Sequence, residues 1–475
     1  MIHENHYREI LRVLQAFFPL RHAPEIAKGD FTMAREMTEG SITKHMLFYA
    51  VPLVFGNLFQ QLYHTVDSVV VGQYYGKTGL AAVGAAGPIM NILTFLIVGI
   101  SMGTSILMAR YFGAKSYEEM RQELGTSLTA GALLTAVLMI LSYLGSGFFI
   151  WLTRTPEEIA DSATVYLRII SIGLFFTFLY NLFSAALRAI GDSKAPLYVL
   201  ILTTIVNVFL DIFLVGLLRM GVPGAALATI ISQAVSGLAL VVYIYVKVPL
   251  LQLKAADLRL NRDMLKLTVD FSSVSAVQQT TLYVGRLLVQ SGVNSLGVDA
   301  VAAFNAVSII DSYVLAPGDS LAASITTFTA QNLGGKKYRR IPQGLKCMFI
   351  LAEVYTITVT VLVLLGRSPL LGIFLKPEET EAIRHGLSYL IPMASFYFLS
   401  GLNNTWQGYY RGLGRLKVTL SATLVQIPIR VVFTYLLLGF CGIQAVAIGT
   451  AIGWGCMFFY ELSVYRKSGR VVESA

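Results

Sequence analysis

Apolar stretches of about 20 residues recur along this chain from residue 45 to residue 465, with very few charged residues inside them. A stretch of about this length is what an α-helix needs to cross the hydrocarbon core of a bilayer. Only 13 % of the 475 residues are charged, which is about half of the share found in an average soluble protein. The sequence therefore predicts a membrane protein that crosses the bilayer many times.

The stretches predict an all-α fold with twelve transmembrane helices. A membrane β-barrel would instead show short segments of alternating polarity. The predicted spans are 45–72, 81–108, 124–146, 163–187, 195–218, 223–246, 266–291, 300–327, 344–365, 385–410, 418–438 and 442–464.

The basic residues are distributed unevenly between the two sides of these spans. Most of the 36 lysines and arginines fall in alternate loops and in the two terminal segments, and Arg188 and Arg411 are counted with them. By the positive-inside rule these segments are cytoplasmic. Both termini are therefore expected in the cytoplasm of a protein of the cell (inner or plasma) membrane. The net charge of +9 has this topological cause and does not indicate nucleic-acid binding.

The two halves of the chain repeat each other. Pro156-Glu157-Glu158 returns as Pro377-Glu378-Glu379, 221 positions later, and Arg188-Ala189-Ile190-Gly191 returns as Arg411-Gly412-Leu413-Gly414. An even number of helices per copy keeps both copies in the same orientation, as in parallel repeats whose substrate path lies between the two bundles. The predicted organisation is an N-terminal extension (1–40), a six-helix lobe (41–246), a cytoplasmic basic linker (247–265), a second six-helix lobe (266–465) and a cytoplasmic tail (466–475).

Polar side chains form a stripe along the first predicted span. They recur at steps of three and four residues, which places them on one helix face. We expect this face to point towards the bundle interior, where an ionisable group is by default a functional candidate. The stripe comprises Asn57, Gln60, Gln61, His64, Asp67 and Ser68.

The fifth predicted span carries Asn207 and Asp211, which are four residues apart and therefore share a helix face. Thr203 and Thr229 can add hydroxyl oxygens to these groups. A carboxylate in apolar surroundings can take up a proton, and the same oxygens suit a hard cation such as Na⁺. The residues alone do not separate these two ions.

The second half lacks this Asn–Asp pair, since Arg430 and Thr434 stand at the equivalent positions. It offers amides instead, and these are candidates for lining the substrate cavity: Gln278, Gln279, Asn403 and Gln407. Asp311, Asp319 and Arg430 are charged groups whose roles the sequence leaves open.

Several motifs resemble the multidrug and toxic compound extrusion (MATE) family over about residues 41–465. They are QQLYHTVDSVVVGQYYG, GLAAVGAAGPI, ARYFGAKSYEE, RAIGDSKAP and NVFLDIFLVGLLRMGVPGAALATIISQ. The resemblance implies a secondary antiporter that expels organic, often cationic, compounds in exchange for H⁺ or Na⁺. It also implies a coupling site at Asp67, Asn207, Asp211 and Thr229. Some sodium-coupled relatives have a Glu where Ile190 stands here, and that departure favours H⁺.

Two other functions would require different residues. A flippase for phospholipids or lipid-linked saccharides, in the same wider superfamily, would favour a basic central cavity, whereas few Arg and Lys lie inside the predicted spans. A membrane enzyme would need a metal-binding acidic pair or a sizeable soluble domain, and neither is visible. The three cysteines fit no metal spacing. The expected partners are small organic molecules and lipid, with no cofactor besides the coupling ion, and the expected state is a monomer.

Overall fold

The computed structural model describes residues 35–473, with the side chains at 64, 66–72, 75–78, 80 and 468–473 excepted. Residues from Arg35 onward belong to one compact unit. The predicted N-terminal extension (1–40) lies almost wholly outside the described residues. The side chains of His64 and Asp67 lie outside them as well.

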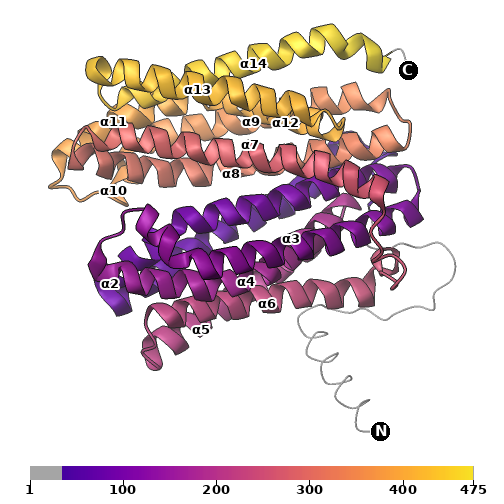
Figure 1. Ribbon diagram of the computed structural model, residues 1–475. Helices are drawn as coiled ribbons and strands as arrows, with labels where there is room; N and C mark the ends of the chain where they lie inside the picture. Colours follow the sequence, from indigo (N-terminus) through magenta and orange to yellow (C-terminus); the bar gives the residue numbers. More distant parts are fainter. Residues whose placement is uncertain (1–34, 474–475) are drawn as a thin grey trace. The chain divides into compact units, whose positions relative to one another are not determined.

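The described chain is α-helical, and short loops join its helices (Figure 1). The helices of the first half are α2 (Ile42–Gly113), α3 (Tyr117–Leu152), α4 (Glu157–Ala189), α5 (Lys194–Asp211) and α6 (Val222–Lys247). Those of the second half are α7 (Arg262–Asn294), α8 (Val298–Gly334), α9 (Arg340–Leu365), α10 (Arg367–Gly372), α11 (Thr380–Ser395), α12 (Tyr397–Gly412), α13 (Leu416–Cys441) and α14 (Gln444–Glu473). A π-helical turn, Ile212–Leu217, follows α5, and a 3₁₀ turn, Pro249–Leu251, lies in the predicted linker.

Within the described residues, ten helical segments are long and apolar enough to cross a membrane. The other two predicted spans correspond to α7 and to the pair α11–α12. Helix α7 is long enough but carries Gln278, Gln279 and many Ser and Thr. The predicted span 385–410 is divided at Phe396, four residues after Pro392, and a proline inside a helix removes a backbone donor. The break predicted between the first two spans is not seen, because α2 is helical throughout and contains both 42–63 and 81–113.

Large apolar side chains cover the outer faces of these helices. Leu144 on α3, Ile205 and Phe209 on α5 and Phe440 on α13 are 74 %, 63 %, 67 % and 88 % exposed. Side chains of this kind are stable when they face lipid rather than water. The inner faces of α3 and α4 instead carry small or polar residues, such as Ser142 and Ser171, whose hydroxyls are 2.7 Å apart.

The two halves meet mainly through α2, which packs against α7 and α8 as well as against α4 and α5 of its own half. Figure 1 shows the helices of the first half, from indigo to magenta, beside those of the second half, from salmon to yellow. Polar contacts cross this boundary. The Tyr49 hydroxyl donates to the Arg188 carbonyl at 3.1 Å and lies 2.9 Å from the Thr327 hydroxyl.

Helices α4 and α12 end in the same way. Each is followed by a glycine in the left-handed region, Gly191 with φ of +88° and Gly414 with φ of +74°. Glycine adopts this conformation without the steric cost that a side chain adds, so it commonly ends a helix. Arg188 and Arg411 therefore lie in the last turns of their helices.

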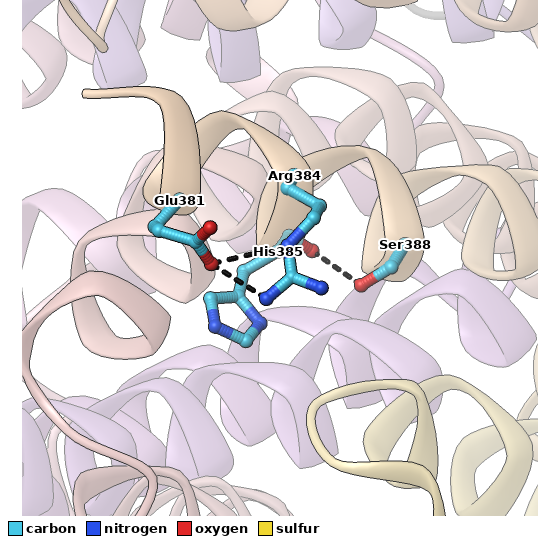
Figure 2. Close-up of polar contacts among 4 residues, drawn as sticks. All are labelled: Glu381, Arg384, His385 and Ser388. Carbon is cyan, nitrogen blue, oxygen red and sulfur yellow. Dashed lines mark hydrogen bonds and ion pairs between the residues drawn. The ribbon is translucent and has the colours of Figure 1, made fainter. Parts of the chain in front are cut away.

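Helices α4 and α11 carry acidic residues in their first turns. At the start of α11, Glu381 accepts hydrogen bonds from Arg384, with the Nη2–Oε2 atoms 2.5 Å apart, and the Ser388 hydroxyl donates to the His385 carbonyl at 2.9 Å (Figure 2). Both partners of this ion pair are mostly exposed. An exposed pair of this kind adds little to stability, but Glu381 in the first turn also favours the helix through its dipole.

Candidate functional site

Thr203, Asn207 and Asp211 occupy one face of α5 at steps of four residues, as the sequence predicts. Their side chains are 5 %, 0 % and 0 % exposed. The Asn207 amide is buried and has no hydrogen-bond partner among the described residues. Asp211 is the last residue of α5, and the π-helical turn begins directly after it. Single π-helical turns inside helices are frequent at functional sites.

A cavity of about 350 Å³ lies inside the first half, next to this face. Thr203 and Thr229 line it, together with Asn57 and Gln60 of α2. The Thr229 hydroxyl donates to the Ala225 carbonyl at 3.0 Å, which leaves its oxygen free to act as an acceptor. The structure thus brings Thr203 and Thr229 to one cavity and places Asn207 and Asp211 in the protein interior on the same face of α5. The approach of Asp67 to this group stays a prediction.

A second cavity, of about 780 Å³, lies between the two halves. Most of the amides proposed from sequence line it: Asn57, Gln60, Gln61, Gln278, Gln279, Asn403 and Gln407. Asn57 donates to the Ser320 hydroxyl at 2.9 Å across the boundary between the halves. Asn57 and Gln60 line both cavities. The two cavities therefore share part of their walls, and this volume is typical of sites for drug-sized molecules.

The amides of the second half are part of a buried chain of hydrogen bonds. Gln278 donates to Gln407 at 2.7 Å and to the Thr423 hydroxyl at 3.0 Å, and Gln407 donates to Glu461 at 2.5 Å. Glu461 is fully buried on α14. This acid is not among the residues proposed from the sequence, although its position inside the predicted span 442–464 is a signal that identifies it.

Glu123 on α3 is a second buried acid that was not proposed from the sequence. It is fully buried and accepts hydrogen bonds from Ser127 at 3.1 Å and from Thr268 at 2.8 Å. Since Thr268 belongs to α7, this carboxyl connects the two halves. Glu123 stands among other charged residues near the start of a predicted span. Charged residues at such a position usually extend to the membrane interface, so the sequence did not indicate that Glu123 is buried.

The charged residues of the cavity differ from the expectation. Arg188 and Arg411, counted with the cytoplasmic loops from sequence, line the central cavity together with Arg430 and Asp319. Their helices extend further than the apolar stretches do, so that the last turn of each helix still borders the cavity. Asp311 is buried and accepts a hydrogen bond from the Tyr397 hydroxyl.

Comparisons with known proteins agree with this architecture. Residues 52–213 and 275–436 each match the MatE family model, once per half. The probable multidrug resistance protein YoeA of Bacillus subtilis is 29 % identical over 362 residues, covering 75 % of this chain and 78 % of that protein. YpnP of the same organism, also named a probable multidrug resistance protein, is 27 % identical over 433 residues, covering 90 % and 94 %.

Solved structures show the same fold. The crystal structure of MATE in complex with MaL6 superposes with a TM-score of 0.87 at 22 % identity, covering 92 % of this chain and 99 % of that one. Repeated helical halves around a shared cavity define a multi-pass membrane transporter. The chain belongs to the MATE family, because its two family matches together cover more than half of its length.

Proposed function

We propose that this protein is a secondary active antiporter that exports small organic molecules in exchange for a cation, H⁺ rather than Na⁺. It acts as a monomer in the cell membrane, with both termini in the cytoplasm. The names of its relatives, which refer to multidrug resistance, support export of foreign compounds. The positive-inside distribution of Lys and Arg supports the orientation.

One observation carries the coupling proposal. Asp211 is fully buried on the α5 face from which Thr203 reaches a cavity that shares Asn57 and Gln60 with the central cavity. Burying an ionised carboxylate is costly unless a cation neutralises it. Binding of a cation at Asp211 can therefore be sensed by groups that also border the substrate space.

The set of ligands favours a proton. Asn207, Asp211, Thr203 and Thr229 supply a few oxygens, with Asp67 as a predicted addition. Ile190, at the position where some sodium-coupled relatives carry a Glu, is a buried apolar residue here. A proton needs only one carboxylate, whereas Na⁺ needs several oxygens around it.

Transport follows if cation and substrate favour different arrangements of the halves. A ligand shifts a conformational equilibrium only by its difference in affinity for the two states. In this scheme the occupied Asp211 site stabilises one arrangement and the bound substrate the other, so that one ligand displaces the other.

The test is efflux of a fluorescent drug from proteoliposomes that contain the purified protein. An imposed pH gradient without Na⁺ should drive efflux, whereas an inward Na⁺ gradient at equal pH, with a protonophore present, should not. Asp211→Asn should abolish gradient-driven efflux. Asp270→Asn is the matched control, because Asp270 is an exposed carboxylate on α7. Gradient-driven efflux by Asp211→Asn at the wild-type rate would contradict the coupling role.

A further inference from the structure

The central cavity carries an excess of cationic side chains. Arg188, Arg411 and Arg430 line it, and Asp319 is the acidic residue among its described lining. Arg188 and Arg411 come from equivalent positions of the repeat, one in each half, so that both halves present a guanidinium to the same space. A cavity selective for organic cations needs a surplus of carboxylates, and this cavity has a surplus of guanidinium groups instead.

The nearby carboxyl groups are engaged with neutral donors. Asp311 accepts from the Tyr397 hydroxyl, and Glu461 accepts from Gln407. Asp192, four residues after Arg188, accepts from the backbone amides of Lys194 and Ala195, both at 3.1 Å, and from the Tyr243 hydroxyl at 2.9 Å. These carboxyls are therefore held in place by groups other than the arginines.

The arginines of the cavity do not form ion pairs with these carboxyl groups. Among the described residues, no carboxylate oxygen lies within 4.0 Å of a side-chain nitrogen of Arg188, Arg411 or Arg430. The Nε atoms of Arg411 and Arg430 are buried without a hydrogen-bond partner. Asp319 and Glu461 lie close enough to act on Arg411 electrostatically, and Asp311 acts on Arg430 in the same way, but none of these acids forms an ion pair with its arginine. A buried guanidinium in this condition is costly and gains from an anion that binds it.

The rest of the lining is suited to an apolar body. Phe95, Leu282, Trp454 and Met457 border the cavity beside the amides. Aromatic and thioether groups adapt to varied apolar shapes, whereas the guanidinium fork recognises carboxylate, sulfonate or phosphate oxygens. The lining thus combines an apolar wall with anion-recognising groups.

We infer that the central cavity binds drug-sized amphiphilic organic anions, whose anionic group contacts Arg188 and Arg411. This inference rests on the proposed export function, because it names the substrate class of the same cavity. Since the two arginines come from different halves, an anion between them binds best in the arrangement that presents both. That difference in affinity is what transport requires.

The test compares two fluorescent amphiphiles with the same naphthalene body, one carrying a sulfonate and the other a trimethylammonium group. Binding to the purified full-length protein in uncharged detergent is measured by fluorescence anisotropy. The sulfonate should bind about tenfold more tightly than the ammonium compound, a difference of about 1.4 kcal/mol. Arg188→Gln and Arg411→Gln should each weaken sulfonate binding about tenfold and leave ammonium binding unchanged or stronger.

Arg384→Gln is the control, because Arg384 is an exposed arginine that does not line the cavity and pairs with Glu381 instead (Figure 2). A single symmetric gel-filtration peak checks the fold of each variant. Tighter binding of the ammonium compound, or sulfonate binding that ignores both cavity variants, would overturn the inference. Competition by a zwitterionic phospholipid as strong as that by the sulfonate would also overturn it, because selection would then not depend on net negative charge.

Different results would contradict the antiport proposal and the anion inference. Loss of gradient-driven efflux in Asp211→Asn bears on the antiport proposal alone, whereas sulfonate binding by Arg188→Gln and Arg411→Gln bears on the anion inference alone. Coupled efflux of the ammonium compound without sulfonate binding contradicts the anion inference and leaves the antiport proposal intact. Sulfonate binding through the arginines, without efflux of either compound under any gradient, contradicts antiport and leaves the binding site intact.

Discussion

Gly113 and Gly334 stand at equivalent positions of the repeat, and each packs against the backbone of the helix that carries the other. A Cβ on Gly113 would lie 2.0 Å from the Gln331 carbonyl oxygen, and a Cβ on Gly334 would lie 1.9 Å from the Arg110 carbonyl oxygen. Gln331 is in turn the repeat counterpart of Arg110. The last turns of α2 and α8 therefore cross in backbone contact at the end of the molecule that the sequence predicts to be cytoplasmic.

This crossing predicts that Gly113→Ala and Gly334→Ala force the two halves apart. Overpacking costs about 1–3 kcal/mol, so the free energy of unfolding should fall by that order in each variant. The cavity should also open towards the cytoplasm. A cysteine at Ala323, which lines the cavity, should react faster with maleimide in inside-out vesicles, in a background without Cys347, Cys441 and Cys456.

Gly147→Ala serves as the control for this crossing, because a Cβ at Gly147 meets nothing within 4 Å. Unchanged labelling in both crossing variants would show that the contact does not seal the cavity.

Thr229 distinguishes the two candidate ions. Thr229→Val removes a hydroxyl oxygen and keeps the shape of the side chain. A proton bound at Asp211 does not need this oxygen, so pH-driven efflux should stay within about twofold of the wild-type rate, whereas loss of one ligand weakens a sodium site about tenfold or more. Efflux rates in proteoliposomes at several Na⁺ concentrations decide the matter, and a rise in the Na⁺ concentration needed for half-maximal efflux would identify a sodium site.

The chain Gln278–Gln407–Glu461 predicts a contrast between two substitutions at Glu461. Glu461→Gln keeps an oxygen that accepts from Gln407, so the apparent unfolding temperature should change little. Glu461→Leu leaves the Gln407 donor buried without an acceptor, which costs about 1–3 kcal/mol. Thermal unfolding of both purified variants measures the difference, and equal loss of stability in the two would mean that this hydrogen bond does not hold α12 to α14.

The predicted orientation is tested with single cysteines in intact cells. Lys337 and Lys376 are both exposed and lie in loops predicted to face opposite sides of the membrane. An impermeant maleimide should label Lys376→Cys and should label Lys337→Cys only after the cells are permeabilised. The reverse pattern would contradict cytoplasmic termini.

Much of the architecture follows from the sequence alone. Lipid forces a spanning segment to satisfy its backbone internally, so twenty apolar residues can hardly be anything but a helix. The repeat follows from similar residues at a nearly constant offset. The shared face of Thr203, Asn207 and Asp211 follows from helical periodicity. Each of these properties is local, or depends only on comparing the chain with itself.

The tertiary structure decided which of these faces meet. Arg188 and Arg411 were predicted to be loop residues. An arginine in a cytoplasmic loop and an arginine in the last turn of a cavity-lining helix have the same local sequence. Glu461 became part of a chain of hydrogen bonds only through Gln407, 54 positions away. Cavity charge and cross-helix hydrogen bonds depend on the packing of helices that are distant in sequence, and helical periodicity does not encode which helices become neighbours.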